Sequence, residues 1–271
     1  ELRSYARRSL EQCEESAMAA ALQASEPECI PRTAFDISAI PGLAERLEPT
    51  RTTTEAIKAN KRKDGRGLDV WRAAHVTTNG DAATATIKGS RATARARIAA
   101  PEKDEPRLSF EVRRGALASD DRWCRRVAQL LEDCWADGAA LDRGVLDDGV
   151  ARKVEVLVTC ESDDGGVEDC VVLAASAAIA ALENTPLVLH AAPLTCAVTE
   201  DGAVLADPSM DEASGCARAT VVVGVDRSSG DASSLLKVSV NGAMPAAALE
   251  RCVALSQKRA ATIPWPHAMA D

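Results

Sequence analysis

Aromatic residues are scarce in this sequence, at 3% of 271 positions, and it lacks long hydrophobic runs. Without a stretch of about 18 uncharged apolar residues, nothing predicts a membrane-spanning helix, so we expect no membrane partner. A hydrophobic fraction of 46% is nevertheless too high for a disordered chain. Because alanine and valine supply most of it, we expect a core of small side chains in which helix lies close to sheet.

Metal-binding and nucleophilic motifs are also missing. The three histidines are scattered, and the nine cysteines contain no Cys-x-x-Cys pair. Since a structural zinc site needs four clustered ligands, we expect neither metal nor cofactor. The cysteines are odd in number and several lie in apolar runs, which predicts reduced thiols in a cytosolic or nuclear compartment. Ser176 and Ser209 have no histidine at a spacing that suggests a catalytic triad.

The charge is distributed unevenly. The net charge is −9, yet the window 51–126 holds 18 basic against 10 acidic side chains, a balance of +8. Nucleic-acid binding needs basic groups that displace phosphate counterions. The sequence thus predicts either one anion-facing region in an acidic protein, or basic and acidic faces that are solvated or paired with each other.

The chain divides into an N-terminal extension and a larger domain. Residues 1–24 carry a helical apolar stripe, and prolines punctuate the stretch after it, so residues 1–46 are predicted to be a helix and a proline-rich arm. Residues 47–271 form the main domain, with halves at about 47–140 and 150–262. A short helix is expected over 51–60, before the charged turn 61–67.

The main domain is predicted to be α+β, a two-layer α/β arrangement with helices on one side of the sheet. Alternating residues predict antiparallel strands in its first half and a helix from Ser119 to Trp135. In 91–97, arginine falls on one face and alanine on the other. The first-half strands are expected at 69–78, 81–89, 91–99 and 107–113, with turns at Asn79-Gly80 and Gly89-Ser90. In the second half, we expect strands at 152–161, 194–199, 203–206, 217–225 and 234–239, a nearly all-apolar and therefore buried helix at 167–184, and a last helix at 244–261.

Several short motifs, in order, resemble the RNase PH family, and within it the non-catalytic PH-type subunits of the RNA exosome ring. They are the opening signature Leu47-Glu48-Pro49, Lys58, Asn60, Lys63-Asp64-Gly65-Arg66 with Arg72 on the first strand, the central helix and its exit at 178–187, the acidic segment Glu200-Asp201-Gly202 with 204–209 and Asp211-Glu212, and the late strand 219–223 with its turn at Asp226. Together they span 47–262.

This resemblance implies an RNase PH, or ribosomal protein S5 domain 2-like, fold with an N-terminal helical extension. It also implies a place in a six-membered ring in the nucleus, nucleolus and cytoplasm. The implied partners are other PH-type subunits, cap proteins, a hydrolytic exoribonuclease and RNA. The implied role is a scaffold in 3′-to-5′ RNA processing and decay, including rRNA maturation.

The resemblance also bears on catalysis. Active members bind phosphate with an arginine at the start of the central helix and use a pair of carboxylates near the late strand. Here Glu168 stands in the arginine position, in Gly165-Gly166-Val167-Glu168-Asp169, and Arg218 replaces one carboxylate, while Glu212 could retain the other. A like charge at about 4 Å from phosphate is repulsive by roughly 1 to 4 kcal/mol. We therefore expect no enzymatic activity and read Gly165-Gly166 as a turn into the helix.

Basic residues in the +8 window are the candidates for RNA contact: Lys63, Arg66, Arg91, Arg95, Arg97, Arg113 and Arg114. For Arg66 the alternative is an anchor from its turn to a carboxylate, and for the strand arginines it is pairing between subunits. Two other functions stay open, an active phosphorolytic 3′-to-5′ exoribonuclease and an RNA-binding adaptor outside the exosome.

Overall fold

The computed structural model describes residues 55–57, 59–101, 107–115, 121–136, 140–147 and 152–266. The predicted N-terminal helix and arm over 1–46 lie outside the described residues, as do Leu47-Glu48-Pro49 and Lys58. The division of the chain into 1–46 and 47–271 stays a prediction, and so does the split of the main domain into halves.

Five strands form the first sheet, in the order β1-β2-β3-β5-β4. Their bounds are β1 Ala74–Asn79, β2 Ala82–Ile87, β3 Ser90–Ala99, β4 Leu108–Arg114 and β5 Lys153–Ser162. The predicted alternation of β3 is confirmed, because its alanines are buried and Arg91, Arg95 and Arg97 are exposed on the outer face. Small buried side chains leave room for a helix to lie close to the sheet.

Strand β4 corrects the all-antiparallel prediction, since it runs parallel to β5. The reason is the connection between them: helix α4 (Asp121–Trp135) and the short helix α5 (Arg143–Asp147) lie between these strands in the chain. A helical crossover of this length brings the chain back in the same direction, whereas a tight hairpin reverses it.

The second sheet has the order β7-β6-β8-β9 and is antiparallel throughout. It consists of β6 Leu189–Val198, β7 Val204–Ala206, β8 Ala217–Asp226 and β9 Ala232–Asn241. Because β7 pairs with β6 only from Cys196 to Val198, the first part of β6 has an open edge. Pro193 lies on that part, where a missing N–H costs no ladder hydrogen bond on the open side.

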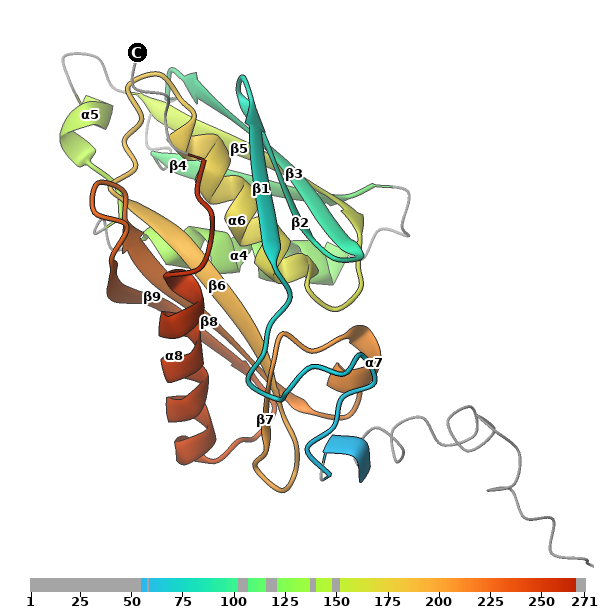
Figure 1. Cartoon of the computed structure of the whole chain (residues 1–271). Helices are drawn as coiled ribbons and strands as arrows, with labels where there is room; N and C mark the ends of the chain where they lie inside the picture. Colours follow the sequence, from blue (N-terminus) through green and yellow to red (C-terminus); the bar gives the residue numbers. More distant parts are fainter. Residues whose placement is uncertain are drawn as a thin grey trace, which may run out of the picture. The chain divides into compact units, whose positions relative to one another are not determined.

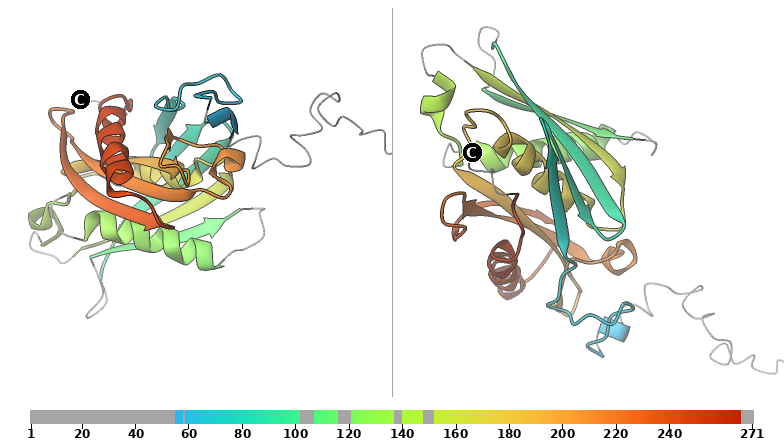
Figure 2. Two further views of the ribbon diagram at one scale, coloured as in Figure 1. Left: turned by 90° about the horizontal axis from the view of Figure 1, so that it is seen from below. Right: turned by 45° about the horizontal axis from the view of Figure 1, so that its top comes forward.

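Helices lie between the sheets and outside them, so the prediction that they cover one side of a sheet was wrong. Helix α6 (Val167–Ala180) contacts both β1–β3 with β5 and β6, and α4 contacts β4 and β9. Helix α8 (Ala246–Ala260) covers the other face of the second sheet against β6 and β8. Figures 1 and 2 show α6 enclosed and α8 on the outside.

The predicted central helix is confirmed by its burial. Every residue of α6 except Glu168 and Ala180 is buried. The helix ends at Ala180, before its predicted end at Asn184, because the Thr185 hydroxyl donates to the carbonyl of Ile179 and Asn184 adopts a positive φ of 53°. Both features satisfy and terminate the last helical turn.

Smaller boundary corrections have local causes. Arg72 precedes β1 instead of lying on it, because its backbone N–H donates to Asp207 Oδ2 at 2.7 Å and not to a strand neighbour. The turns fall one residue away from the predicted dipeptides, at Gly80-Asp81 and Lys88-Gly89. Of the predicted helix over 51–60, residues 55–57 are helical, and Ser119 lies outside the described residues.

Candidate functional site

The charged turn at 61–67 is fastened to the second sheet by a buried ion pair. Arg62 donates from Nε and Nη2 to the two carboxylate oxygens of Glu212, at 2.9 and 2.6 Å, and from Nη1 to the carbonyl of Ala206. Glu212 lies in the short helix α7 (Met210–Ala213), where Ser209 and Glu212 form a capping box. Glu212, predicted as a retained carboxylate of the active site, is therefore engaged on both oxygens.

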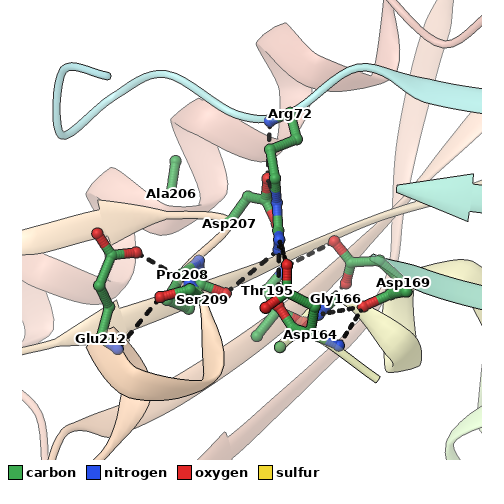
Figure 3. A network of polar contacts seen from close by, with 12 residues as sticks. Arg72, Asp164, Gly166, Asp169, Thr195, Ala206, Asp207, Pro208, Ser209 and Glu212 are labelled. Carbon is green, nitrogen blue, oxygen red and sulfur yellow. Dashed lines mark hydrogen bonds and ion pairs between the residues drawn. The ribbon is translucent and has the colours of Figure 1, made fainter. Parts of the chain in front are cut away.

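Asp207 is the centre of a second cluster, drawn in Figure 3. It is 1% exposed and accepts hydrogen bonds from Arg72 Nε at 2.8 Å and Nη2 at 2.6 Å. Arg66 Nη1 donates to the same carboxylate at 3.1 Å, and Arg66 Nε donates to Asp64. Arg66, a predicted RNA contact, thus anchors its turn to carboxylates, which was the alternative reading of its motif.

The same cluster reaches the start of α6. Arg72 Nη1 donates to the carbonyl and the carboxylate of Asp164, both at 3.1 Å. The backbone N–H of Gly165 donates to Asp163, and that of Gly166 donates to the Ser90 hydroxyl. Because both glycine donors are occupied within the chain, they are not free to hold phosphate, in line with the reading of Gly165-Gly166 as a turn into a helix.

Carboxylates in these clusters stay ionised because arginine outweighs burial. Burial alone would raise the pKa of Glu212, but hydrogen bonds from Arg62 and from the Ser209 backbone hold it below its ordinary value. Asp64 behaves alike, with Arg66 opposing desolvation and lowering its pKa. In Arg72 the hydrogen bonds and charge of Asp207 overcome desolvation and raise the pKa of the guanidinium. These groups are fixed charges and not proton donors at neutral pH.

Glu168, predicted to replace the phosphate-binding arginine, lies in the first turn of α6. Arg126 of α4 donates to its Oε1 at 2.5 Å, and the Thr220 hydroxyl of β8 donates to Oε2 at 3.4 Å. Sequence reasoning found no arginine near Glu168 in the chain, but the fold supplies one from α4. Arg218, the second predicted substitution, is half-buried on β8, two residues from Thr220, and lines a cavity of about 370 Å³.

Asp169, the next residue of α6, is fully buried and was not singled out by its sequence context. It accepts from the Thr195 hydroxyl at 2.7 Å, from the Thr195 backbone N–H at 3.2 Å, and from Arg259 Nη1 at 2.5 Å. Asp169 thereby satisfies the open edge of β6. The signal that could have found it is an acidic residue in an otherwise apolar helix, which requires a buried partner.

The predicted RNA-contact arginines on the first sheet are mostly paired with glutamates of that sheet. Arg91 pairs with Glu161, Arg97 with Glu155 and Arg113 with Glu111. Arg114 lies 4.2 Å from the ring centroid of Trp123 and 3.6 Å from Asp163. Lys63 and Arg95 are exposed and make no ion pair with the described residues. The outer face therefore combines paired and free basic groups.

Other nucleophiles are buried. Ser176 Oγ lies 3.4 Å from His190 Nδ1, a proximity that their spacing in the sequence did not predict. Both are buried, His190 stacks on Trp265, and burial followed by the charge of Arg227 lowers the pKa of His190 to about 4. Burial also raises the pKa of Cys160 and Cys170 to about 12, so these thiols are poor nucleophiles.

Among the described residues, no group of three or more histidine, cysteine or acidic side chains is arranged to hold a metal ion. In the same part of the chain, no helix is long and apolar enough to cross a membrane. The seven cysteines that the structure describes are all free thiols.

Comparisons with known proteins decide the fold. Residues 191–259, from β6 to α8, match the 3′ exoribonuclease family, domain 2. The chain has the RNase PH fold. A solved structure titled archaeal exosome core is similar to it with a TM-score of 0.65 and 19% identity, covering 78% of this chain and 92% of that one.

Two further structures share this RNase PH fold. One is the Archaeoglobus fulgidus exosome with RNA bound to the active site, with a TM-score of 0.64, 19% identity and coverage of 78% and 94%. The other is rice (Oryza sativa) Rrp46, with a TM-score of 0.61, 18% identity and coverage of 73% and 94%. A search of curated proteins by sequence gives no match. The expected fold class, α+β with the RNase PH arrangement, is confirmed.

Proposed function

We propose that this RNase PH-like chain is a non-catalytic subunit of an RNA exosome ring, where it supports the ring and lines the RNA path during 3′-to-5′ RNA processing and degradation. Its partners would be other PH-type subunits, cap proteins, a hydrolytic exoribonuclease and RNA. We place it in the nucleus, nucleolus and cytoplasm. The similarity of its fold to exosome core structures supports this proposal.

One observation carries the non-catalytic assignment, the carboxylate of Glu168 in the first turn of α6. Phosphorolysis places a dianionic nucleophile beside an anionic phosphodiester, which requires unoccupied cationic donors. Arg126 is the cation that contacts this turn, and its Nη2 is engaged with Glu168. The pair offsets part of the repulsion that a lone Glu168 would exert, but it leaves no net positive charge for phosphate.

Arg218 and Glu212 support the same assignment. A general acid must reach the leaving oxygen, whereas Glu212 is 3% exposed and bonded to Arg62 on both oxygens. Arg218 carries a positive charge where active relatives are expected to carry a carboxylate. Guiding RNA without cutting it requires only a cationic path along the phosphate backbone.

The rival function, phosphorolytic exoribonuclease, is tested on the purified ring. We expect no phosphate-dependent release of nucleoside diphosphates from oligo(A) that depends on this chain. Glu168→Arg and Arg218→Asp, alone and together, restore residues of the active type and serve as the matched comparison. Release that is lost when Arg126 or Glu168 is replaced in this chain would contradict the proposal.

The other rival, an RNA-binding adaptor outside the exosome, is tested by affinity purification of the full chain and mass spectrometry. Recovery of five other PH-type proteins is expected. Recovery of ribosomal proteins without PH-type subunits would refute exosome membership. Deletion of 1–46 in the same experiment tests whether this extension docks on a neighbouring subunit or a cap protein.

A further inference from the structure

Arg259, near the end of α8, has an incomplete set of partners. It is 1% exposed, and only Nη1 is bonded, to Asp169. Its Nε and Nη2 are buried and have no hydrogen-bond partner among the described residues. Buried donors are nearly always satisfied, and a guanidinium cannot escape the cost by losing its proton.

The two free donors lie on one edge of the guanidinium. Nε–H and Nη2–H point in parallel, and this fork matches the two oxygens of a carboxylate or a phosphate. The same edge is filled in two other buried arginines of this chain. Arg62 places Nε and Nη2 on Glu212, and Arg72 places Nε and Nη2 on Asp207. In Arg259 no described residue fills the equivalent position.

A cavity of about 330 Å³ lies at this arginine. Its walls come from the segment that leads into β1, which contributes Trp71 to His75, and from the end of α8 with Thr262 to Pro264. Ala73, His75 and Thr262 are exposed, so the cavity opens to solvent. Its volume accommodates a small oxyanion such as phosphate or acetate.

We propose that this cavity is a binding site for a small oxyanion, a phosphate or a carboxylate group held bidentately by Nε and Nη2 of Arg259. The site is separate from the first turn of α6, where Glu168 lies, and does not depend on the exosome assignment. Asp169 orients the guanidinium through Nη1 and leaves its other edge toward the ligand. Arg72 adds positive potential at the wall, although its own donors are occupied by Asp207 and Asp164.

The experiment titrates the full chain with sodium phosphate and, separately, with sodium acetate at constant ionic strength. Binding is followed by calorimetry and by the Arg259 Nε–H signal in 15N-resolved NMR, which Arg259→Lys identifies. Phosphate binding assigns the site to a phosphate group, and acetate binding alone assigns it to a carboxylate. Either result requires a shift of the Arg259 signal. Absence of binding by both anions would overturn the proposal.

Two variants of Ala73 keep the test valid if Arg259→Lys does not fold. Ala73→Glu puts a carboxylate on the cavity wall, and Ala73→Gln has nearly the same size without the charge. Ala73→Glu is expected to weaken oxyanion binding by about tenfold or more, the size of one lost charge-assisted contact, and Ala73→Gln by clearly less. Equal affinity in wild type and Ala73→Glu would place the anion elsewhere and overturn the assignment.

Discussion

Arginine and carboxylate pairs in the interior fix how individual residues respond to substitution. Arg62 and Arg72 each direct two donors at one carboxylate, and all four groups are at least nine-tenths buried. A buried pair adds little when compared with a well-packed apolar pair, but removal of one partner leaves the other charge unsatisfied. These pairs therefore matter more for holding the turn at 61–67 in place than for net stability.

Glu212→Gln tests this asymmetry. The amide keeps the shape of the side chain but leaves Arg62 without a counter-charge, so we expect a loss of about 3 to 5 kcal/mol in unfolding free energy. Urea denaturation followed by circular dichroism measures it. Asp211→Asn in the same helix is the control, because Asp211 is exposed. Equal effects of the two substitutions would contradict the role of the buried pair.

His190 makes stability depend on pH. Its pKa is about 4 in the folded chain, against an ordinary value of 6.5, because burial and then Arg227 disfavour the charged ring. As the pH falls, the unfolded chain takes up this proton first. The stability contributed by neutral His190 is thus complete above about pH 6.5, and about 3 kcal/mol of it is lost by about pH 4.

Denaturant titrations at pH 7 and pH 5 measure this loss through the fluorescence of Trp265, which stacks on His190 with ring centroids 4.2 Å apart. His190→Gln is expected to flatten the pH dependence in this range. His75→Gln removes an exposed histidine and should leave the dependence as in wild type. A pH profile of His190→Gln that matches wild type would refute the assignment.

At the scale of elements, the start of α6 is fixed by its contact with the loop that precedes α7. Gly165 has a φ of +90°, and a Cβ there would lie 2.6 Å from Pro208 O and Met210 N. A side chain at this position must therefore displace backbone, and it would also move Asp164 and Gly166. The tight approach explains how α6, β7 and Arg72 come together in Figure 3.

Gly165→Ala is predicted to destabilise the chain much more than Gly80→Ala. Gly80 has a φ of +61°, but a Cβ at this position would have nothing within 4 Å, so it carries only the conformational cost of about 1 to 2 kcal/mol. Gly165→Ala adds a backbone clash, and we expect its thermal midpoint to be lower than that of Gly80→Ala by several degrees. Similar midpoints in calorimetry would show that the loop at 208–210 yields easily.

Patterns within one element were predictable from the sequence, and relations between elements were less so. Alternation in 91–97 and the apolar run of 167–184 predicted β3 and α6, because burial follows the period of the element itself. The parallel pairing of β4, the position of α8 and the partner of Arg62 depend on chain segments far apart. Ser209 and Glu212 have the spacing of a capping box, which was the one local signal for Glu212.

The candidate site shows the same division. Glu168 was found by its place in a motif, whereas Arg126, which neutralises it, comes from another helix. The charge run 61–63 predicted a solvated turn, but Arg62 is buried within it while Lys63 is exposed. A run of like charges carries no information about which member turns inward, since that depends on where a carboxylate lies in the fold.

On the scale of the whole molecule, the question is how a chain of net charge −9 would contact RNA. The outer face of the first sheet is nearly balanced, because Arg91, Arg97 and Arg113 are each paired with a glutamate of that sheet. Such exposed pairs are weak and exchange readily with solvent. We therefore expect the isolated chain to bind RNA weakly through this face, with few released counterions.

Removing the paired glutamates tests whether this face contacts RNA. The triple variant Glu111→Gln, Glu155→Gln and Glu161→Gln frees three arginines without altering them. If the face lies on the RNA path, single-stranded RNA affinity rises, and the slope of log K against log salt steepens by up to about 0.7 for each freed arginine. Glu250→Gln on α8 is the control for net charge, since it changes an exposed acid on another element. An unchanged slope in the triple variant would remove this face from the RNA path and leave Arg91, Arg97 and Arg113 to the pairing between subunits that was their alternative.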